Sequence, residues 1–440
     1  MDYTSQTLAH FCSSVSTDDV PEQVLDAAER ALLDTIAAII GGAGTKNAHC
    51  IRSAGFNIFG EGAFKAWFCD SDPMHFLGAL LANCAAASAL DIDDGHRGAA
   101  GHPGAAIIPA VLMQCQKAPP LPGRDILAAI AIGYDVALRI GQSRHRHDQI
   151  SYASGIWTCY GVAAALGRLN GLSDSSLAHA IAIAGAEAPQ NLPQGACLAS
   201  SVKGSSPWST VTAAVAVARA AAGASGSIDL LDRPTAYDIA AICQDLSVRW
   251  LITETYQKPY ASCRYTHPVI DAILQLRPAA GWNISQIQSI TVEIFPEAEK
   301  LPNNVAPTSL EDAQFSIPFA AALAIVTGAS GFRPLQPDSL EDSRILGLAQ
   351  KICLDYSSTD FHNVFPARTP ARVTLVIDGK HQSVQVDYPV GDVANPMSTE
   401  AIASKLADLD CQTSSRTGDL LAAVKNLRRS DSKQLLDLLV

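Results

Sequence analysis

The chain has 440 residues, of which 48% are hydrophobic and 17% charged, and its formal net charge is −12. This length predicts about two to four domains, or one large domain with an appendage, and the composition excludes intrinsic disorder. The acidic balance, without a basic stripe, excludes a nucleic-acid-binding protein. An anionic ligand therefore needs a local pocket of positive charge.

Three features of the sequence indicate the cellular compartment: the N-terminus, the apolar runs and the cysteines. The chain begins Met-Asp-Tyr-Thr-Ser-Gln, which has neither the basic nor the apolar region of a signal peptide. The richest apolar run, 211–226, contains Arg219 and is shorter than the ~20 residues that span a bilayer. The 11 cysteines form no C-x-x-C pair, which disfavours zinc and iron–sulfur sites. We expect a cytoplasmic protein without a membrane segment; no clear transit peptide is present, although a mitochondrial location stays open.

The first ~250 residues read as successive helices, with almost no strand signal. Residues 21–40 open with a proline, repeat apolar residues every three to four positions and end at Gly41-Gly42. Further helices are expected at 74–90, 105–115, 125–141, 157–169, 174–185 and 207–223. Many of them are rich in alanine, which allows helices to pack closely.

The pattern changes after about residue 256. A helix at 268–275 precedes residues 289–295, which alternate with the period of a strand, and 317–327 predict another helix. Residues 371–377 and 383–388 flank Asp378-Gly379, which predicts a β-hairpin. Helices at 399–409 and 417–439 close the chain.

These elements predict a mainly α protein with an α+β second domain. The helical domain takes residues 1–256 together with 405–440, and the α+β domain takes residues 257–404. A cleft between two such bodies is a common ligand site.

The densest polar cluster lies between two predicted helices, at residues 91–104. It places three carboxylates and two imidazoles on a glycine-rich loop, namely Asp91, Asp93, Asp94, His96 and His102. Such groups can pair a base with the acid that orients it. A calcium loop fits poorly, since Gly95 and His102 stand where that motif needs its ligands. The structural alternative, in which aspartate caps a helix and histidine is solvated, stays equally open.

Cations gather at two other places. Lys258, Arg264 and His267 fall within ten residues at the change of domain, a set that suits a substrate with several carboxylates. The alternative is a surface linker with ordinary cations. Lys203 stands just before the most apolar predicted helix, where a single lysine is more often a solvated helix flank.

Taken in order, these segments resemble the MmgE/PrpD family, which contains 2-methylcitrate dehydratases, cis-aconitate decarboxylases and iminodisuccinate epimerases. The resemblance covers nearly the whole chain. It is carried by Leu33-Asp34-Thr35-Ile36-Ala37, Leu90-Asp91-Ile92-Asp93-Asp94, His102-Pro103, Lys203, Lys258-Pro259-Tyr260, Cys263-Arg264-Tyr265-Thr266-His267-Pro268, Phe315-Ser316-Ile317-Pro318, Phe365-Pro366-Ala367-Arg368-Thr369-Pro370 and Gly391-Asp392 before Asn395-Pro396.

The resemblance implies an α+β lid over the helical domain, a homodimer, and catalysis of a small di- or tricarboxylate without metal or other cofactor. It places Asp91, His102, Lys203 and Lys258 in the catalytic centre, with His102 as the leading acid/base. The lysines are expected to bind or protonate substrate. The expected substrate-binding residues are Asp93, Asp94, His96, Arg264, His267, Trp157 and Phe319.

Several positions depart from the family pattern. Gly95 stands where threonine is frequent, Gly155 falls about where a histidine is expected, and Phe319 replaces a frequent tyrosine. The resemblance implies that cis-aconitate decarboxylation uses several of these missing polar groups, which favours dehydration. The two glycines also remove bulk, which predicts a pocket for a substrate larger or more apolar than methylcitrate.

We therefore expect a cofactor-independent dehydratase of a citrate-type tricarboxylic acid, 2-methylcitrate or a longer 2-alkylcitrate, that yields an aconitate-like alkene. Removing a proton next to a carboxylate needs a placed base and cations that stabilise the growing charge. The enzymatic alternatives are a cis-aconitate-type decarboxylase and an iminodisuccinate-type epimerase. The non-enzymatic alternative is a carboxylate-binding protein that has lost turnover.

Overall fold

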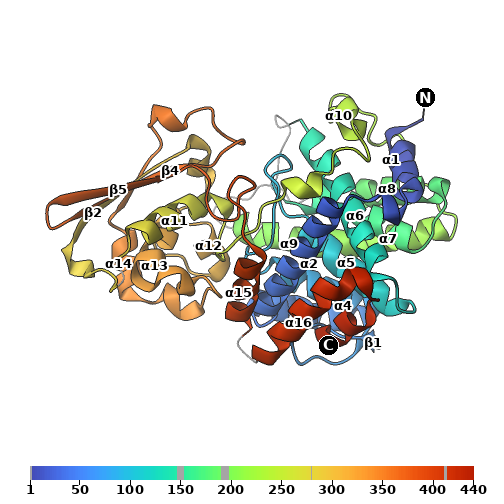
Figure 1. Cartoon of the computed structure of the whole chain (residues 1–440), viewed down its shortest axis with the longest axis horizontal. Coiled ribbons are helices and arrows are strands. Elements are labelled where there is room, and N and C mark those ends of the chain that lie inside the picture. The colour runs from blue at the N-terminus through green and yellow to red at the C-terminus, as the bar shows by residue number, and fades with distance from the viewer. Residues whose placement is uncertain (1, 146–152, 190–197, 279, 411–413) are drawn as a thin grey trace.

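The computed structural model describes residues 2–145, 153–189, 198–278, 280–410 and 414–440. Figure 1 shows two bodies side by side, a larger helical body and a smaller lid that contains the sheet. The predicted fold class, mainly α with an α+β second domain, is confirmed.

The helical body contains all seven helices predicted for the first half of the chain. Its N-terminal helices are α1 (Thr4–Ser14), α2 (Glu22–Gly42), α3 (Lys46–Phe59), α4 (Phe76–Ser88), α5 (Gly104–Lys117), α6 (Gly123–Ser143), α7 (Gly155–Leu169), α8 (Asp174–Glu187), α9 (Leu198–Ala221) and α10 (Ile239–Cys243). The sequence pattern does not predict α1, α3 or α10. It places the start of α9 at Pro207, whereas the helix begins at Leu198 and continues through this proline. A short strand, β1 (Glu61–Phe64), lies after α3.

Helix α6 forms the centre of the helical body, where it packs against α7, α2 and α5. Among the described residues, it is the one helix whose length and hydropathy suffice to cross a bilayer. However, 94% of its apolar window is buried inside the protein. Most residues of α6 are buried, so its apolar composition is that of a helix in the protein core.

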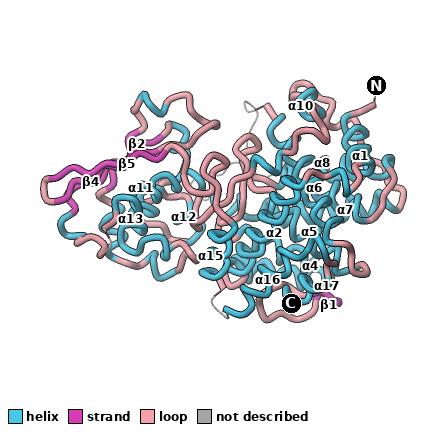
Figure 2. The backbone as a smooth tube through the Cα atoms, viewed as in Figure 1, coloured by secondary structure: helices cyan, strands magenta, loops and turns pink. Residues whose placement is uncertain are grey.

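The lid contains a four-stranded mixed sheet. Its helices are α11 (His267–Leu276), α12 (Leu310–Gln314), α13 (Ile317–Thr327) and α14 (Ser343–Ala349), and its strands are β2 (Ile287–Ile294), β3 (Ile352–Asp355), β4 (Ala371–Ile377) and β5 (Lys380–Val386). The strand order is β3-β2-β4-β5, in which only β2 and β3 run parallel. Helix α11 packs against β4 and β5, and Figure 2 shows the strands gathered at the far end of the lid.

The predicted β-hairpin is present. Strands β4 and β5 are joined by Asp378 and Gly379, whose φ angles of 48° and 73° fit the two central residues of a type I′ turn. Strand β5 begins at Lys380, earlier than predicted. Strand β3 has four residues, too few to display an alternating pattern, so the sequence does not predict it.

The chain returns to the helical body earlier than predicted. Helix α15 (Thr399–Leu409) packs against α2, and α16 (Ser414–Asn426) contacts both. Figure 1 shows these C-terminal helices in red against the blue and cyan helices of the body. The predicted boundary between residues 404 and 405 therefore falls inside α15. The single helix predicted at 417–439 is instead α16 and α17 (Lys433–Leu439), separated by a short 3₁₀ turn.

Candidate active site

The loop between α4 and α5 carries the predicted acid/base residues and faces the lid. Asp91 adopts a left-handed conformation, with φ of 52°. Gly95 exchanges two backbone hydrogen bonds with Tyr256, of 2.9 and 2.8 Å. This pairing brings the segment that contains Lys258 alongside the loop, although more than 150 residues separate them in sequence.

The Asp91 carboxylate lies among three nitrogen groups. The Lys203 ammonium donates to Oδ1 at 2.7 Å, the Lys258 Nζ lies 3.1 Å from Oδ2, and the His102 Nε2 lies 3.8 Å from Oδ1. Burial alone raises the pKa of Asp91, but Lys203, Lys258 and His102 outweigh it and hold the pKa well below its usual range. The structure thus brings together the four predicted catalytic residues from three separate stretches of chain.

Lys258 is completely buried. Burial lowers the pKa of an ammonium group, but here the negative charge of Asp91, and of Asp93 at 4.0 Å, outweighs it and raises the pKa of Lys258. Lys258 therefore remains an ammonium group at neutral pH.

The hydrogen bonds of His102 define its tautomer. Its Nδ1 lies 2.5 Å from the backbone carbonyl oxygen of Asp94, and because a carbonyl only accepts, Nδ1 carries the hydrogen. Nε2 is then the unprotonated nitrogen, directed toward Asp91. Burial and the charge of Lys258 lower the pKa of His102, so the ring is neutral at pH 7. A proton taken up at Nε2 creates an imidazolium that Asp91 stabilises.

Asp94 holds the loop against α5. Its Oδ1 accepts a hydrogen bond from the backbone N–H of Gly104 at 3.0 Å, and its Oδ2 accepts one from the Tyr134 hydroxyl at 2.9 Å. Burial, together with the charges of Asp34 and Asp93, raises the pKa of Asp94 to about 8. These contacts match the structural alternative, in which an aspartate caps a helix.

A cavity of about 130 Å³ opens beside Asp91 and His102. Pockets for drug-sized ligands usually measure ~300–1,000 Å³, so this one suits a small acid. Its wall comes from both bodies and consists of Asp91, His96, Arg97, Ala100, Gly101, His102, Tyr256, Cys263, Arg264, Tyr265, Lys300, Leu301, Phe315, Phe365 and Thr369.

Two of the predicted binding residues lie on this wall. His96 accepts a hydrogen bond at Nδ1 from the backbone N–H of Ala99, and burial lowers its pKa to about 4, so it is neutral. Arg264 donates to the backbone oxygens of Pro389 and Val390, at 3.0 and 2.9 Å, and burial lowers its pKa to about 10.

The other predicted binding residues do not line this cavity. Trp157 and Phe319 are buried in the packing of α7 and α13, because their helical positions direct them into the cores. His267 lies behind Arg264, 3.3 Å from its guanidinium. Asp93 and Asp94 are buried beneath the loop, and Lys203 and Lys258 reach the site through Asp91.

Several wall residues are absent from the set that the sequence predicts. Arg97 belongs to the polar loop, and its guanidinium contacts Asp392 and, at 2.5 Å, the carbonyl oxygen of Ala367, which links the helical body to the lid. The polar loop was a sufficient signal to find Arg97. Lys300 gave no signal, since it ends a five-residue 3₁₀ segment of the lid.

The room expected beside two glycines is absent. A Cβ atom on Gly95 would lie 2.4 Å from the Tyr256 hydroxyl oxygen, and one on Gly155 would lie 2.4 Å from the Ser205 hydroxyl oxygen. Neighbouring side chains therefore fill both spaces. The prediction that these glycines enlarge the pocket is wrong, because they serve close packing instead.

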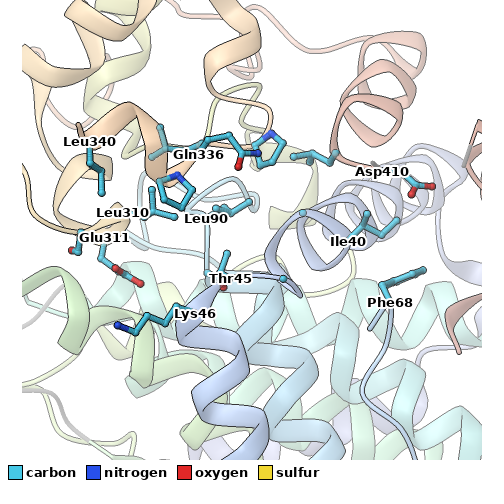
Figure 3. A pocket seen from close by; sticks show the side chains of 18 of the residues that line it. Ile40, Thr45, Lys46, Phe68, Leu90, Leu310, Glu311, Gln336, Leu340 and Asp410 are labelled. Carbon is cyan, nitrogen blue, oxygen red and sulfur yellow. The ribbon is translucent and has the colours of Figure 1, made fainter. Parts of the chain in front are cut away.

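A larger cavity, of about 520 Å³, lies elsewhere between the two bodies (Figure 3). Thr45, Lys46, Glu311 and Asp410 lie on its wall. Neither the carboxylate of Asp91 nor any of the three nitrogen groups around it reaches this cavity, so we assign the chemistry to the smaller one. Among the described residues, no group of three or more His, Cys, Asp or Glu side chains is arranged to hold a metal ion.

Comparison with known proteins agrees with this architecture. A model described as the MmgE/PrpD N-terminal domain matches residues 6–246, and the MmgE/PrpD C-terminal domain matches residues 260–426. A cis-aconitate decarboxylase of Aspergillus terreus (strain NIH 2624 / FGSC A1156) is 24% identical, over 98% of this chain and 95% of its own length. A second cis-aconitate decarboxylase from Aspergillus terreus shows the same identity and coverage. Since the two family models together match most of the chain, the chain belongs to the MmgE/PrpD family, whose enzymes act on citrate-type acids.

Proposed function

We propose that the protein is a cofactor-independent dehydratase of a citrate-type tricarboxylic acid, with 2-methylcitrate as the first substrate to test. The observation that carries this proposal is the state of His102. Its ring is neutral, its Nε2 is unprotonated, and it stands 3.8 Å from Asp91 on the wall of a small cavity. A base in this state can remove a proton from a carbon next to a carboxylate.

The elimination breaks a C–H bond and a C–O bond and forms a C=C bond. Nε2 of His102 takes the proton, the C–H electron pair becomes the new C=C bond, and the C–O bond breaks. The departing hydroxide takes a proton and leaves as water. We assign this proton to the ammonium of Lys203, which reaches the cavity through its hydrogen bond to Asp91. The Asp91 carboxylate, on the cavity wall, passes a proton to the hydroxide and receives one from Lys203.

Substrate carboxylates need cations within the cavity. Arg97, Arg264 and Lys300 come to its wall from the helical body and the lid. A guanidinium binds a carboxylate through two parallel hydrogen bonds, and an ammonium attracts it as a point charge. These cations suit an acid with more than one carboxylate, and they stabilise the charge that grows on its oxygens.

Part of the wall is apolar, which supports an alkyl substituent on the substrate. Leu301, Phe315 and Phe365 line the cavity from the lid. The small volume favours 2-methylcitrate over longer 2-alkylcitrates, which remain the second group of substrates. One methylene in an apolar pocket changes kcat/KM by about 10–200-fold, so a homologous series is a sensitive probe.

Decarboxylation of cis-aconitate is the second candidate. Both Aspergillus terreus relatives are named cis-aconitate decarboxylase, and each is similar to this chain over nearly its whole length. In that reaction a C–C bond breaks, CO₂ leaves, and the remaining carbon receives a proton. The same cations and ammonium donor serve this chemistry. Neither Gly155 nor Phe319, two positions that depart from the family pattern, lies on the cavity wall, so the product assay decides between the two reactions.

One product assay tests these functions. Citrate, 2-methylcitrate, 2-ethylcitrate, cis-aconitate and iminodisuccinate are incubated separately with the protein, while alkene absorbance, CO₂ release and optical rotation are followed. We expect alkene formation without CO₂, fastest with 2-methylcitrate. CO₂ release from cis-aconitate alone supports the second candidate, and loss of rotation without alkene supports an epimerase. Saturable binding of these acids without any turnover overturns an enzymatic function.

A further inference from the structure

A second buried ion pair lies in the helical body beneath the polar loop. The Lys405 ammonium donates to Oδ1 of Asp34 at 2.7 Å, and both side chains are completely buried. Asp34 belongs to α2, whereas Lys405 belongs to α15, which follows the lid in the sequence. Neither residue lines the cavity, so neither touches a substrate there.

Lys405 also donates to the carbonyl oxygen of Ile92, at 2.6 Å. Ile92 follows Asp91, whose left-handed backbone is unfavourable for a non-glycine residue and persists only where the surroundings fix it. On the other side of Asp91, the Gln314 side chain donates to the carbonyl oxygen of Ala89 at 3.1 Å. The backbone on both sides of Asp91 is therefore held by side chains from distant parts of the chain.

We propose that Lys405 and Asp34 are positioning residues, which fix the backbone of Asp91 so that its carboxylate meets His102, Lys203 and Lys258. Lys405 holds the Ile92 carbonyl, and Asp34 holds the Lys405 ammonium in place. The expected effect of these residues on turnover rests on the proposed function. Their expected effect on the conformation of the loop does not.

Stability alone does not explain this pair. Replacing both members of a buried ion pair with apolar residues is often neutral or stabilising, whereas removing one member leaves an uncompensated buried charge. Other charges also face Lys405, namely those of Asp93 and Lys258. The contact with Ile92 is the feature that an apolar pair cannot replace.

The test uses this difference between single and double replacement. Asp34→Leu and Lys405→Met are each expected to lower the melting temperature by about 5 °C or more. The double variant Asp34→Leu/Lys405→Met recovers most of that loss. We nevertheless expect its kcat to stay about 10²-fold below the wild-type value with a smaller change in KM, because a misplacement of about 1 Å has this effect.

The matched control is the buried pair of Asp135 and Arg139 on α6, whose closest atoms are 2.6 Å apart. These two side chains also hold backbone groups, those of Ile242, Gln244, Asp245, Arg249 and Leu251, but none of these residues lines the cavity. The double variant Asp135→Leu/Arg139→Met therefore loses a buried ion pair and its backbone contacts away from the site. We expect its kcat to stay within about twofold of wild type.

A crystal structure of the Asp34→Leu/Lys405→Met variant provides a readout that needs no substrate. We expect Asp91 to leave the left-handed region and its carboxylate to move away from Lys203. Wild-type turnover in this variant, or an unchanged loop, overturns the positioning role. If the wild type converts none of the acids, the proposed function fails, while the loop structure still decides the inference.

Discussion

The helical body and the lid contribute differently to the same cavity. The body supplies Asp91, His102 and Lys203 in an enclosed setting, where burial and neighbouring charges determine which groups are ionised. The lid supplies Arg264, which is buried, Lys300, which is exposed, and the apolar side chains of the wall. A group that transfers a proton needs a tuned pKa and therefore burial in a rigid body. A group that only attracts an anion needs no shifted pKa and can stand on an exposed surface, as Lys300 does.

The largest effect is expected from the acid/base in the helical body. His102→Gln keeps a polar side chain of similar size but cannot accept a proton, so kcat falls by about 10²–10⁴-fold. The kinetics are measured with the substrate that the product assay identifies, alongside the melting temperature. His179→Gln, on α8, is the matched control and leaves kcat unchanged. A loss of less than tenfold at His102 removes it from the role of base.

A smaller effect, on a different kinetic constant, is expected from the lid. Lys300→Met removes an exposed cation from the cavity wall, so KM rises by about fivefold while kcat stays nearly constant. The difference shrinks at high ionic strength because salt screens exposed charges. Lys351→Met, an exposed lysine of the lid outside the cavity wall, is the control. A fall in kcat with constant KM contradicts the division of tasks between the two bodies.

The pH dependence of kcat/KM tests the ionisation of His102 in the helical body. Of the three predictions, it concerns the smallest effect. Burial and the charge of Lys258 lower the pKa of His102 below its usual 6.5. Because the neutral ring is the base, activity is present above this lowered pKa and is lost as the pH falls through it. We expect the acid limb of kcat/KM below pH 6.5, after correction for the ionisation of the substrate. Because kcat/KM reports the free enzyme, a limb above pH 6.5 contradicts the lowered pKa of His102.

Periodic patterns predicted the regular parts of this fold. The limits of α13 and α15 match the predicted residues, and Asp378-Gly379 predicted the hairpin turn. Short or weakly periodic elements, such as β3 and α3, were not predicted. The site residues likewise were predictable only where they formed a local cluster in the sequence. The polar loop and its cations were visible as clusters, whereas Lys300 and the apolar wall had no local pattern.

Tertiary packing also changed the meaning of single residues. Gly95 and Gly155 suggested free space, but Tyr256 and Ser205 fill it. Trp157 and Phe319 suggested a binding surface, but they belong to the cores of the two bodies. A sequence gives the size of a side chain at each position without giving the neighbours that occupy the space around it.

The sequence by itself determined most of the longer helices, the hairpin and the identity of the charged groups, because these depend on local periodicity, turn chemistry and residue type. Only the tertiary structure decided which charges meet. The ionisation of Asp91, the tautomer of His102 and the contact between Lys405 and Ile92 depend on distances of a few ångströms between segments far apart in the chain. Electrostatic interactions and burial act through space, so no pattern along the chain encodes them.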